Sequence, residues 1–214
     1  MAFPTTAVLD DFNRADSTTT IGTSWSVLAD YFSGDADHGI ISNQLYNPQT
    51  DDYVAMYWNA GTFGPDSECY MTVTTVPSVD ESLSVGVRNK DVGVGTYDGY
   101  WVFINTSTGL ISVVRVDDDV ATTLGSTVAI TLSAGEKFGI EAIGSTLKAY
   151  HFTGGSWTEK ASRTDSTYGA AGLLAFYIPG AVVTGRFDDF GGGTVVAGGG
   201  ATHPGYMQSR GGWW

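Results

Sequence analysis

Cysteine and positive charge are both scarce in this chain. Cys69 is the only cysteine, so no intrachain disulfide can form. Ten Lys and Arg residues stand against 23 Asp and Glu, which gives a formal net charge of −13 at pH 7. A chain of this sign repels phosphate groups, so nucleic acids and anionic membrane surfaces are unsuitable partners. The sequence also lacks an apolar run of the roughly 20 residues that a membrane-spanning helix needs.

Two further patterns are missing. The N-terminal residues Met1-Ala2-Phe3-Pro4 have neither the basic segment nor the apolar segment of a secretory signal. We therefore expect synthesis in the cytoplasm without export by the general secretory route. No window shows a sustained helical period of apolar residues, which argues against a helical fold.

What the chain does contain is typical of β-structure. Apolar residues alternate with polar ones in many short runs, such as Gly39–Tyr46, and turn-forming residues separate these runs. Gly144-Ser145 and Gly154-Gly155 are good hairpin turns. Leu9–Arg14 and Arg186–Phe190 share an Asp-Asp-Phe sequence. This echo predicts that the first and last strands pair at one edge of a jelly-roll sandwich.

The composition divides the chain into a β domain, residues 1–190, and a glycine-rich arm, residues 191–214. The arm has two glycine triplets, contains no Asp or Glu, and ends in two tryptophans. Large aromatic rings are costly to leave in water, and aromatic and Arg residues are common centres of interfaces. We therefore expect the arm to dock on a partner or on another copy of this chain, with a homo-oligomer as one result. The expected anchors are Tyr206, Met207, Arg210, Trp213 and Trp214.

The sequence resembles the concanavalin A-like lectin and glucanase jelly rolls. The segments that carry the resemblance span most of the chain and are Asp10–Asp16, Ile21–Val27, Ile40–Tyr46, Leu147–Tyr150, Gly169–Phe176 and Arg186–Phe190. The resemblance implies an all-β, antiparallel sandwich. It does not select an activity, because this fold carries lectins, glycosidases, spacer modules and virion proteins.

Within that group, the Met1–Phe12 opening and the aromatic arm resemble structural proteins of tailed bacteriophages. This second resemblance implies a non-enzymatic virion protein that decorates a capsid or forms part of a tail. The arm would then attach it to other virion proteins. A carbohydrate-binding module and a glycoside hydrolase remain the alternatives.

Catalytic residues are not evident. Laminarinase-like glycosidases of this fold carry an E-x-D-x-x-E strand, and this sequence contains no match to that motif. A hydrolase needs two carboxylates about 5–10 Å apart, which adjacent strands could still supply. We therefore expect a binding protein, with hydrolysis as the minority reading.

Sugar binding would use aromatic platforms, because the C–H faces of sugars stack on rings. The candidates are Trp58, Tyr97, Tyr100, Trp101 and Trp157. Since Tyr100 and Trp101 are adjacent in a strand, we expect one in the core and the other exposed. Runs of aspartates such as Asp117-Asp118-Asp119 offer oxygen ligands of the kind that Ca²⁺ prefers. Local turn formation explains these aspartates better, so we assign no metal ligands and no cofactor.

Overall fold

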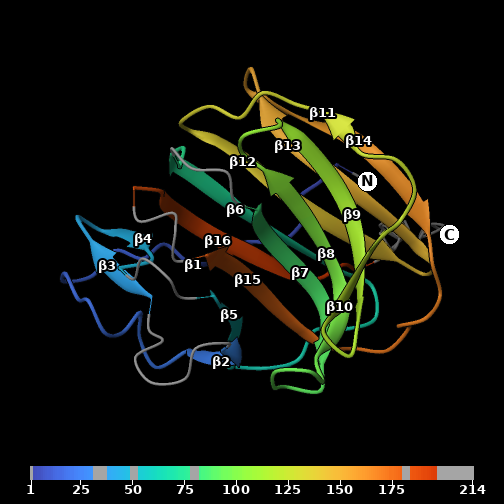
Figure 1. Ribbon diagram of the computed structural model, residues 1–214, viewed down its shortest axis with the longest axis horizontal. Coiled ribbons are helices and arrows are strands. Elements are labelled where there is room, and N and C mark those ends of the chain that lie inside the picture. The colour runs from blue at the N-terminus through green and yellow to red at the C-terminus, as the bar shows by residue number, and fades with distance from the viewer. Residues whose placement is uncertain (1, 31–37, 49–52, 78–81, 180–183, 197–214) are drawn as a thin grey trace, which may run out of the picture.

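The computed structural model describes residues 2–30, 38–48, 53–77, 82–179 and 184–196. In these residues every regular element is a β-strand, and two antiparallel sheets pack face to face (Figure 1). This confirms the predicted all-β sandwich. Within the same residues, no helix is long and apolar enough to cross a membrane.

Each sheet has eight strands. Sheet A has the order β14-β13-β12-β6-β16-β4-β3, with β1 paired to β16. Its strands are β1 (Val8–Asp10), β3 (Gly39–Ile41), β4 (Gln44–Tyr46), β6 (Ser67–Thr75), β12 (Glu136–Ile143), β13 (Thr146–Thr153), β14 (Ser156–Thr164) and β16 (Arg186–Thr194). Sheet B has the order β10-β9-β8-β7-β15-β5-β2, with β11 paired to β9. Its strands are β2 (Trp25–Asp30), β5 (Tyr53–Trp58), β7 (Ser82–Lys90), β8 (Asp98–Asn105), β9 (Leu110–Asp117), β10 (Val120–Thr123), β11 (Val128–Ala129) and β15 (Leu173–Pro179).

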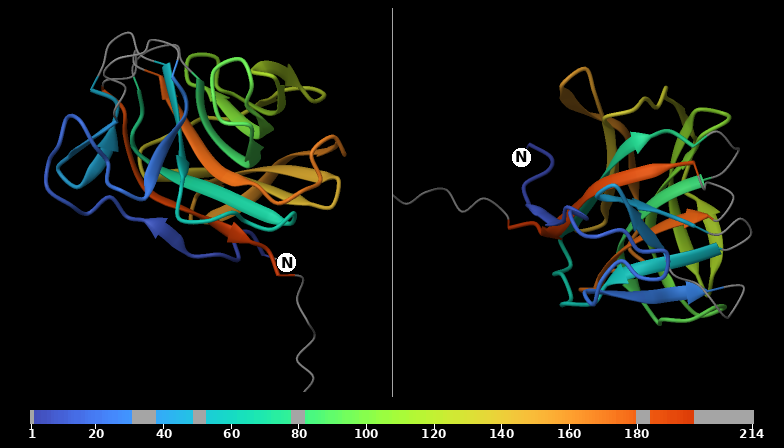
Figure 2. Two further views of the ribbon diagram at one scale, coloured as in Figure 1. Left: turned by 90° about the horizontal axis from the view of Figure 1, so that it is seen from below. Right: turned by 90° about the vertical axis from the view of Figure 1, so that its left-hand side faces the viewer.

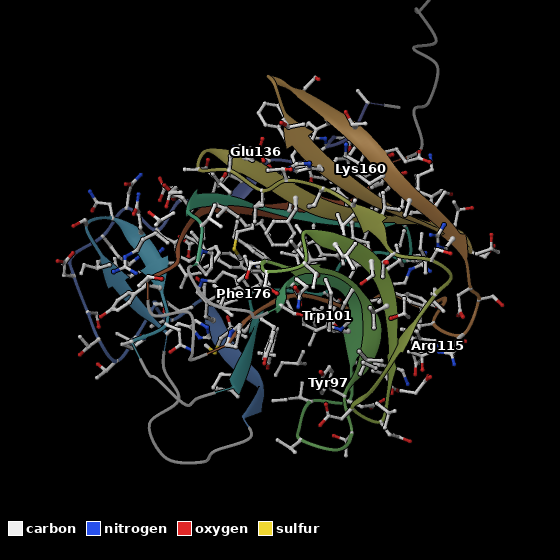
Figure 3. All side chains as sticks on the ribbon, turned by 45° about the horizontal axis from the view of Figure 1, so that its top comes forward. Tyr97, Trp101, Arg115, Glu136, Lys160 and Phe176 are labelled. Carbon is white, nitrogen blue, oxygen red and sulfur yellow. The ribbon has the colours of Figure 1, made fainter. Side chains whose placement is uncertain are left out.

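The core lies between the two sheets and is built by alternate residues of each strand. In β8, for example, Tyr100, Val102 and Ile104 point inward and are fully buried. Phe176 lies in the middle of this layer (Figure 3). Burial of a side chain of this size contributes about 1.5–3 kcal/mol to folding. Apolar residues alternate with polar ones in the sequence because every second side chain of a strand points into this core.

The first and last strands pair as the repeated motif predicts, but not at a sheet edge, because β16 lies inside sheet A between β6 and β4. β1 runs antiparallel to β16, with Asp10 opposite Phe190, and both Phe12 and Phe190 are buried in the core. Asp10 is itself buried and accepts hydrogen bonds from the Trp25 indole N–H at 2.7 Å and the Phe12 backbone N–H at 2.8 Å. The repeated Asp-Asp-Phe sequence therefore ties the start of the chain to the end of the sandwich.

The hairpin turns are also confirmed, whereas one predicted strand is divided. Gly144 and Gly154-Gly155 have positive φ and connect β12 to β13 and β13 to β14. The predicted single strand Gly39–Tyr46 is two strands, β3 and β4, because Ser42 and Asn43 adopt φ of 51° and 61° and reverse the chain.

The first glycines of the predicted arm belong to the sandwich. β16 continues to Thr194, and Gly191 and Gly193 lie opposite Tyr70 and Glu68 of β6. A Cβ atom on Gly191 would lie 2.1 Å from the Tyr70 ring. These glycines therefore serve close packing rather than chain freedom. The expected anchors Tyr206, Met207, Arg210, Trp213 and Trp214 lie outside the described residues.

The N-terminal segment covers the outer face of sheet A. The Phe3 ring stacks on Tyr150 with centroids 4.1 Å apart and meets Trp157 edge-on at 4.8 Å. The buried Glu68 carboxylate accepts four hydrogen bonds from the backbone and hydroxyl groups of Thr5 and Thr6, at 2.5–3.2 Å. The end of β16 lies beside this segment (Figure 2), where the Gly192 N–H donates to the Ala7 carbonyl at 3.2 Å. The N-terminal segment thus covers part of the outer face of sheet A.

Candidate functional site

The outer face of sheet B, which points away from the core, carries a second apolar cluster. Strand alternation places Trp101 and Phe103 of β8 on this face, while Tyr100 and Val102 point inward. The cluster consists of Leu28, Ala55, Trp101, Val114, Val116 and Ala175, with Tyr57, Tyr97, Phe103 and Tyr177 packed against it. In Figure 3, Trp101 and Tyr97 lie on the side of sheet B opposite to Glu136 of sheet A. An apolar and aromatic set on the outside of a sandwich is a candidate binding surface.

Trp101 lies at the centre of this cluster. Its indole ring lies over Gly86, where an added Cβ would fall 2.6–2.8 Å from three ring carbons. Tyr97 and Phe103 meet the indole edge-on at centroid distances of 6.1 and 6.4 Å. The β7–β8 connection is fastened across the sheet by a hydrogen bond of 2.8 Å from the Gly93 N–H to the Leu28 carbonyl. Trp101 is consequently only 1% exposed.

A groove opens beside Phe103 on the same face. Its volume is about 310 Å³. Apolar, hydroxyl and amide side chains line it: Ser82, Phe103, Asn105, Thr108, Leu110, Ser112, Val114, Ala121, Thr123 and Thr127. None of these lining residues is charged. Phe103, Tyr57 and Tyr177 remain partly exposed on this face, whereas Trp101 is covered.

Charged side chains gather at the far end of the sandwich. Arg115 pairs with Asp117 at 2.6 Å and with Asp165 at 2.8 Å, and the Tyr100 hydroxyl donates to Asp165 at 2.5 Å. Burial raises the pKa of Asp165, but hydrogen bonds led by those of Tyr100 and Thr167 outweigh it and lower the pKa to about 2. This network holds the loop after β14 against sheet B. Its charged side chains are not part of the groove lining.

The five predicted sugar platforms do not come together. Tyr100 is fully buried in the core, and Trp101 is covered, so the expectation that one of the pair is exposed is wrong. The reason is that the outer face of sheet B is itself packed around Trp101, where Tyr97 and Phe103 lie against the indole ring. Trp58 packs edge-on against Trp25 at the margin of the core, and Trp157 lies on sheet A beside Phe3. Tyr97 alone joins Trp101 on the groove side.

The partly exposed rings that the sequence analysis missed are those of Tyr57, Phe103 and Tyr177. Period-two alternation from Trp101 leads directly to Phe103, which is two residues further along β8. The other two become neighbours only through strand pairing, since Ala175 lies opposite both Gly86 and Tyr57. The sequence alone does not show how β5, β7 and β15, which are far apart in the chain, align with one another in the sheet.

The glutamates and the aspartate-rich turn considered as catalytic or metal-binding residues lie outside this groove. The described glutamates, Glu68, Glu136, Glu141 and Glu159, all belong to sheet A. In the described ranges, no group of three or more His, Cys, Asp and Glu residues is arranged to hold a metal ion. Asp118 and Asp119 have positive φ in the β9–β10 turn, and Asp119 accepts a hydrogen bond from the Gly95 N–H at 3.0 Å. They act here as turn residues.

Comparison with solved structures places the fold among lectin-like jelly rolls. The carbohydrate-binding module CBM66 from Bacillus subtilis superposes with a TM-score of 0.56 at 12% identity, over 83% of this chain and 98% of that chain. The VIP36 exoplasmic/lumenal domain in its Ca²⁺/Man3GlcNAc-bound form gives 0.59 at 11%, over 82% and 85%.

A Bacillus subtilis protein of unknown function with a galectin-like fold gives a TM-score of 0.62 at 11% identity, over 90% of this chain and 98% of that chain. No protein-family model matches the sequence. No curated protein matches it either. At these identities the likeness defines the fold, and the resemblance to concanavalin A-like jelly rolls is confirmed at that level.

Proposed function

We propose that this protein is a carbohydrate-binding module that holds glycans on the outer face of sheet B. The observation that carries the proposal is the groove of about 310 Å³, where the partly exposed Phe103 ring adjoins neutral hydroxyl groups such as those of Ser82 and Ser112. A ring that stacks on sugar C–H groups, beside donors and acceptors for sugar hydroxyls, is the chemistry that carbohydrate recognition needs. The descriptions of CBM66 and of sugar-bound VIP36 agree with this assignment.

The first experiment is a glycan array probed with the intact chain and with Phe103→Ala. We expect the variant to weaken binding about tenfold or more, because aromatic side chains at binding centres contribute about 1.4 kcal/mol or more, which is a factor of ten in affinity. Phe152→Ala is the matched control, because Phe152 is also a partly exposed strand phenylalanine but lies against Trp157 on sheet A. Binding that is unchanged in Phe103→Ala, or an array without any bound glycan, would refute the proposal.

Hydrolysis and calcium are tested in the same experiment. The groove lining contains no Asp or Glu, so a two-carboxylate mechanism has no residues there. We therefore expect bound oligosaccharides to stay intact in the mixture. Release of reducing sugar would favour the hydrolase alternative. Arrays with added Ca²⁺ and with a chelator show whether binding needs the cation. We expect equal binding in both, because the groove lining has no carboxylate to bind Ca²⁺.

We also propose that the module is a virion component of a tailed bacteriophage, anchored to other virion proteins or to copies of itself by the arm. This rests on the sequence resemblance and on one geometric support. The described chain leaves the sandwich at Val195 and Val196, next to β16 of sheet A, whereas the groove lies on sheet B. Anchoring through residues 197–214 would therefore leave the groove free.

The particle proposal is tested by removing residues 205–214, which include the expected anchors. We expect the shortened chain to keep its melting temperature and its glycan binding but to be absent from purified particles. Incorporation at the normal level would refute docking through the arm.

A further inference from the structure

We infer that the outer face of sheet B takes a neutral, extended oligosaccharide that lies across strands β8, β7 and β15, rather than a charged glycan or a single sugar. This inference rests on the proposed glycan-binding function and adds the class of ligand. Two independent features of the face carry it, namely the absence of charged side chains and the spacing of its partly exposed rings.

The first feature is the uncharged surface. On the three central strands, the positions that share a face with Trp101 are Ser82, Ser84, Gly86, Gly99, Phe103, Asn105, Ala175 and Tyr177. On β9 they are Leu110, Ser112, Val114 and Val116. None of these residues has a charged side chain. An anionic sugar would find no countercharge there, and the net charge of −13 repels it over longer range.

The cations closest to this region along the chain have other partners. Arg88 is buried and donates to the carbonyl oxygens of Pro65, Tyr168 and Gly144 at 2.5–2.9 Å. Lys90 pairs with Asp91 and Asp98 at 2.8 Å, and Arg115 pairs with Asp117 and Asp165. Both lie at the strand ends that are away from the groove. Arg163 supports the segment before Thr127 and donates to the carbonyl oxygens of Leu124 and Ser126 at 2.6 and 2.5 Å. These groups are therefore not available to neutralise a sulfate or carboxylate on the sugar.

The second feature is the spacing of the rings. Phe103 on β8 and Tyr177 on β15 both lie opposite Ser84 on β7, one on each side. Two strand spacings separate the ring-bearing backbones by about 10 Å. One sugar ring cannot lie on both platforms, whereas an extended chain of several sugars that crosses the strands can. Tyr57, on the next strand, continues the platform diagonally from Tyr177.

Ser84 adds a polar group between the two platforms. Its side chain is 1% exposed, and its hydroxyl oxygen has no hydrogen-bond partner within the described structure. A buried hydroxyl without a partner costs free energy, which a sugar hydroxyl could recover only where the flanking side chains move apart to admit it. A chain that bridges Phe103 and Tyr177 passes over this position.

Isothermal titration of the intact chain tests the inference. The neutral probes are β-1,4-linked gluco-, manno- and xylo-oligosaccharides of one to six units, and the acidic probes are oligogalacturonates of the same lengths. For the neutral series that binds best, we expect at least a tenfold gain in affinity from one unit to four. We expect oligogalacturonates of equal length to bind at least tenfold more weakly.

Variants separate the two parts of the inference. Tyr177→Ala should lower the affinity for the four-unit ligand about tenfold and leave that for the one-unit ligand unchanged, whereas Phe103→Ala should lower both. Thr123→Lys, at an exposed position of the groove lining, should raise the affinity for oligogalacturonate several-fold. Phe152→Ala, on the opposite face, is the control, and thermal melting establishes that each variant is folded.

The outcomes are distinct. Oligogalacturonate binding as tight as that of the neutral series overturns the neutral part of the inference. Equal affinity for one and four units, or an equal effect of Tyr177→Ala on both, overturns the extended part. Either result leaves the glycan-binding proposal in place. If no neutral or acidic saccharide binds in this series or on the array, the proposed function itself fails, and this inference fails with it.

Discussion

The buried carboxylate of Asp10 gives the most quantitative test of how this fold is held together. Asp10 is 6% exposed and accepts hydrogen bonds from the Trp25 indole and the Phe12 backbone. Asp10→Ala would leave both donors buried without an acceptor. Each such donor costs about 1–3 kcal/mol, so we expect the free energy of unfolding to fall by about 2–6 kcal/mol. Loss of the Arg14 ion pair adds to this.

A double-mutant cycle isolates the indole contact. Trp25→Phe removes the indole donor while keeping an aromatic ring, so the cost of Asp10→Ala should be smaller in that background. We expect an interaction energy of about 1–3 kcal/mol between the two positions. Denaturant unfolding followed by far-ultraviolet circular dichroism measures it without depending on Trp25 fluorescence.

Asp11 provides the matched control. It is the neighbouring aspartate of the same motif but is exposed, and its carboxylate makes only local hydrogen bonds to Asn13, the backbone one at 3.1 Å. We expect Asp11→Ala to change the free energy of unfolding by less than about 0.5 kcal/mol. If the Asp10 and Trp25 effects add to within about 0.5 kcal/mol, the contact between these two side chains does not stabilise the fold.

Two further tests concern the charged network and the glycines of β16. Because the pKa of Asp165 falls from 3.8 to about 2 on folding, its carboxylate stabilises the protein above pH 4, and this contribution is lost as the pH falls toward 2. Asp165→Asn should therefore flatten the acid limb of the stability curve in pH-dependent denaturant titrations; an unchanged limb would contradict the assignment. Gly191→Ala should destabilise the protein by about 1–3 kcal/mol through its clash with Tyr70, whereas Gly169→Ala, with open space around its Cα, should be nearly neutral in thermal melting. Equal effects at the two glycines would contradict the packing role.

Features set by near neighbours could be predicted from the sequence. The hairpin at Gly154-Gly155 follows from local turn chemistry, and the pairing of β1 with β16 follows from a repeated motif. The turn at Ser42 and Asn43 was missed because it contains no glycine, although both residues adopt positive φ. Period-two alternation correctly placed Tyr100 and Trp101 on opposite faces of the strand. It could not show that both faces are covered at these positions.

Features set by contacts far apart in the chain could not be predicted. The glycine triplet that begins at Gly191 has the composition of a flexible arm, yet Gly191 is required by Tyr70, a residue that is distant in the sequence. The platform of Phe103 and Tyr177 depends on the register of both strands against Ser84. The same limit explains why aromatic residues chosen for loop positions did not come together, since a binding face on a sheet is defined by pairing.

The two outer faces of the sandwich differ in what covers them. This difference matters for how the proposed module would bind a ligand while it is attached to a partner. On sheet A, Glu68 and Tyr70 hold the N-terminal segment down, and Phe3 fills the space that Gly139 leaves. On sheet B, the groove beside Phe103 is left open and uncharged. Since the last described residues leave from sheet A, an attachment through the chain end and a ligand on sheet B would not compete for space. Under the proposed function, attachment through the chain end would leave the groove available to glycans outside a larger particle.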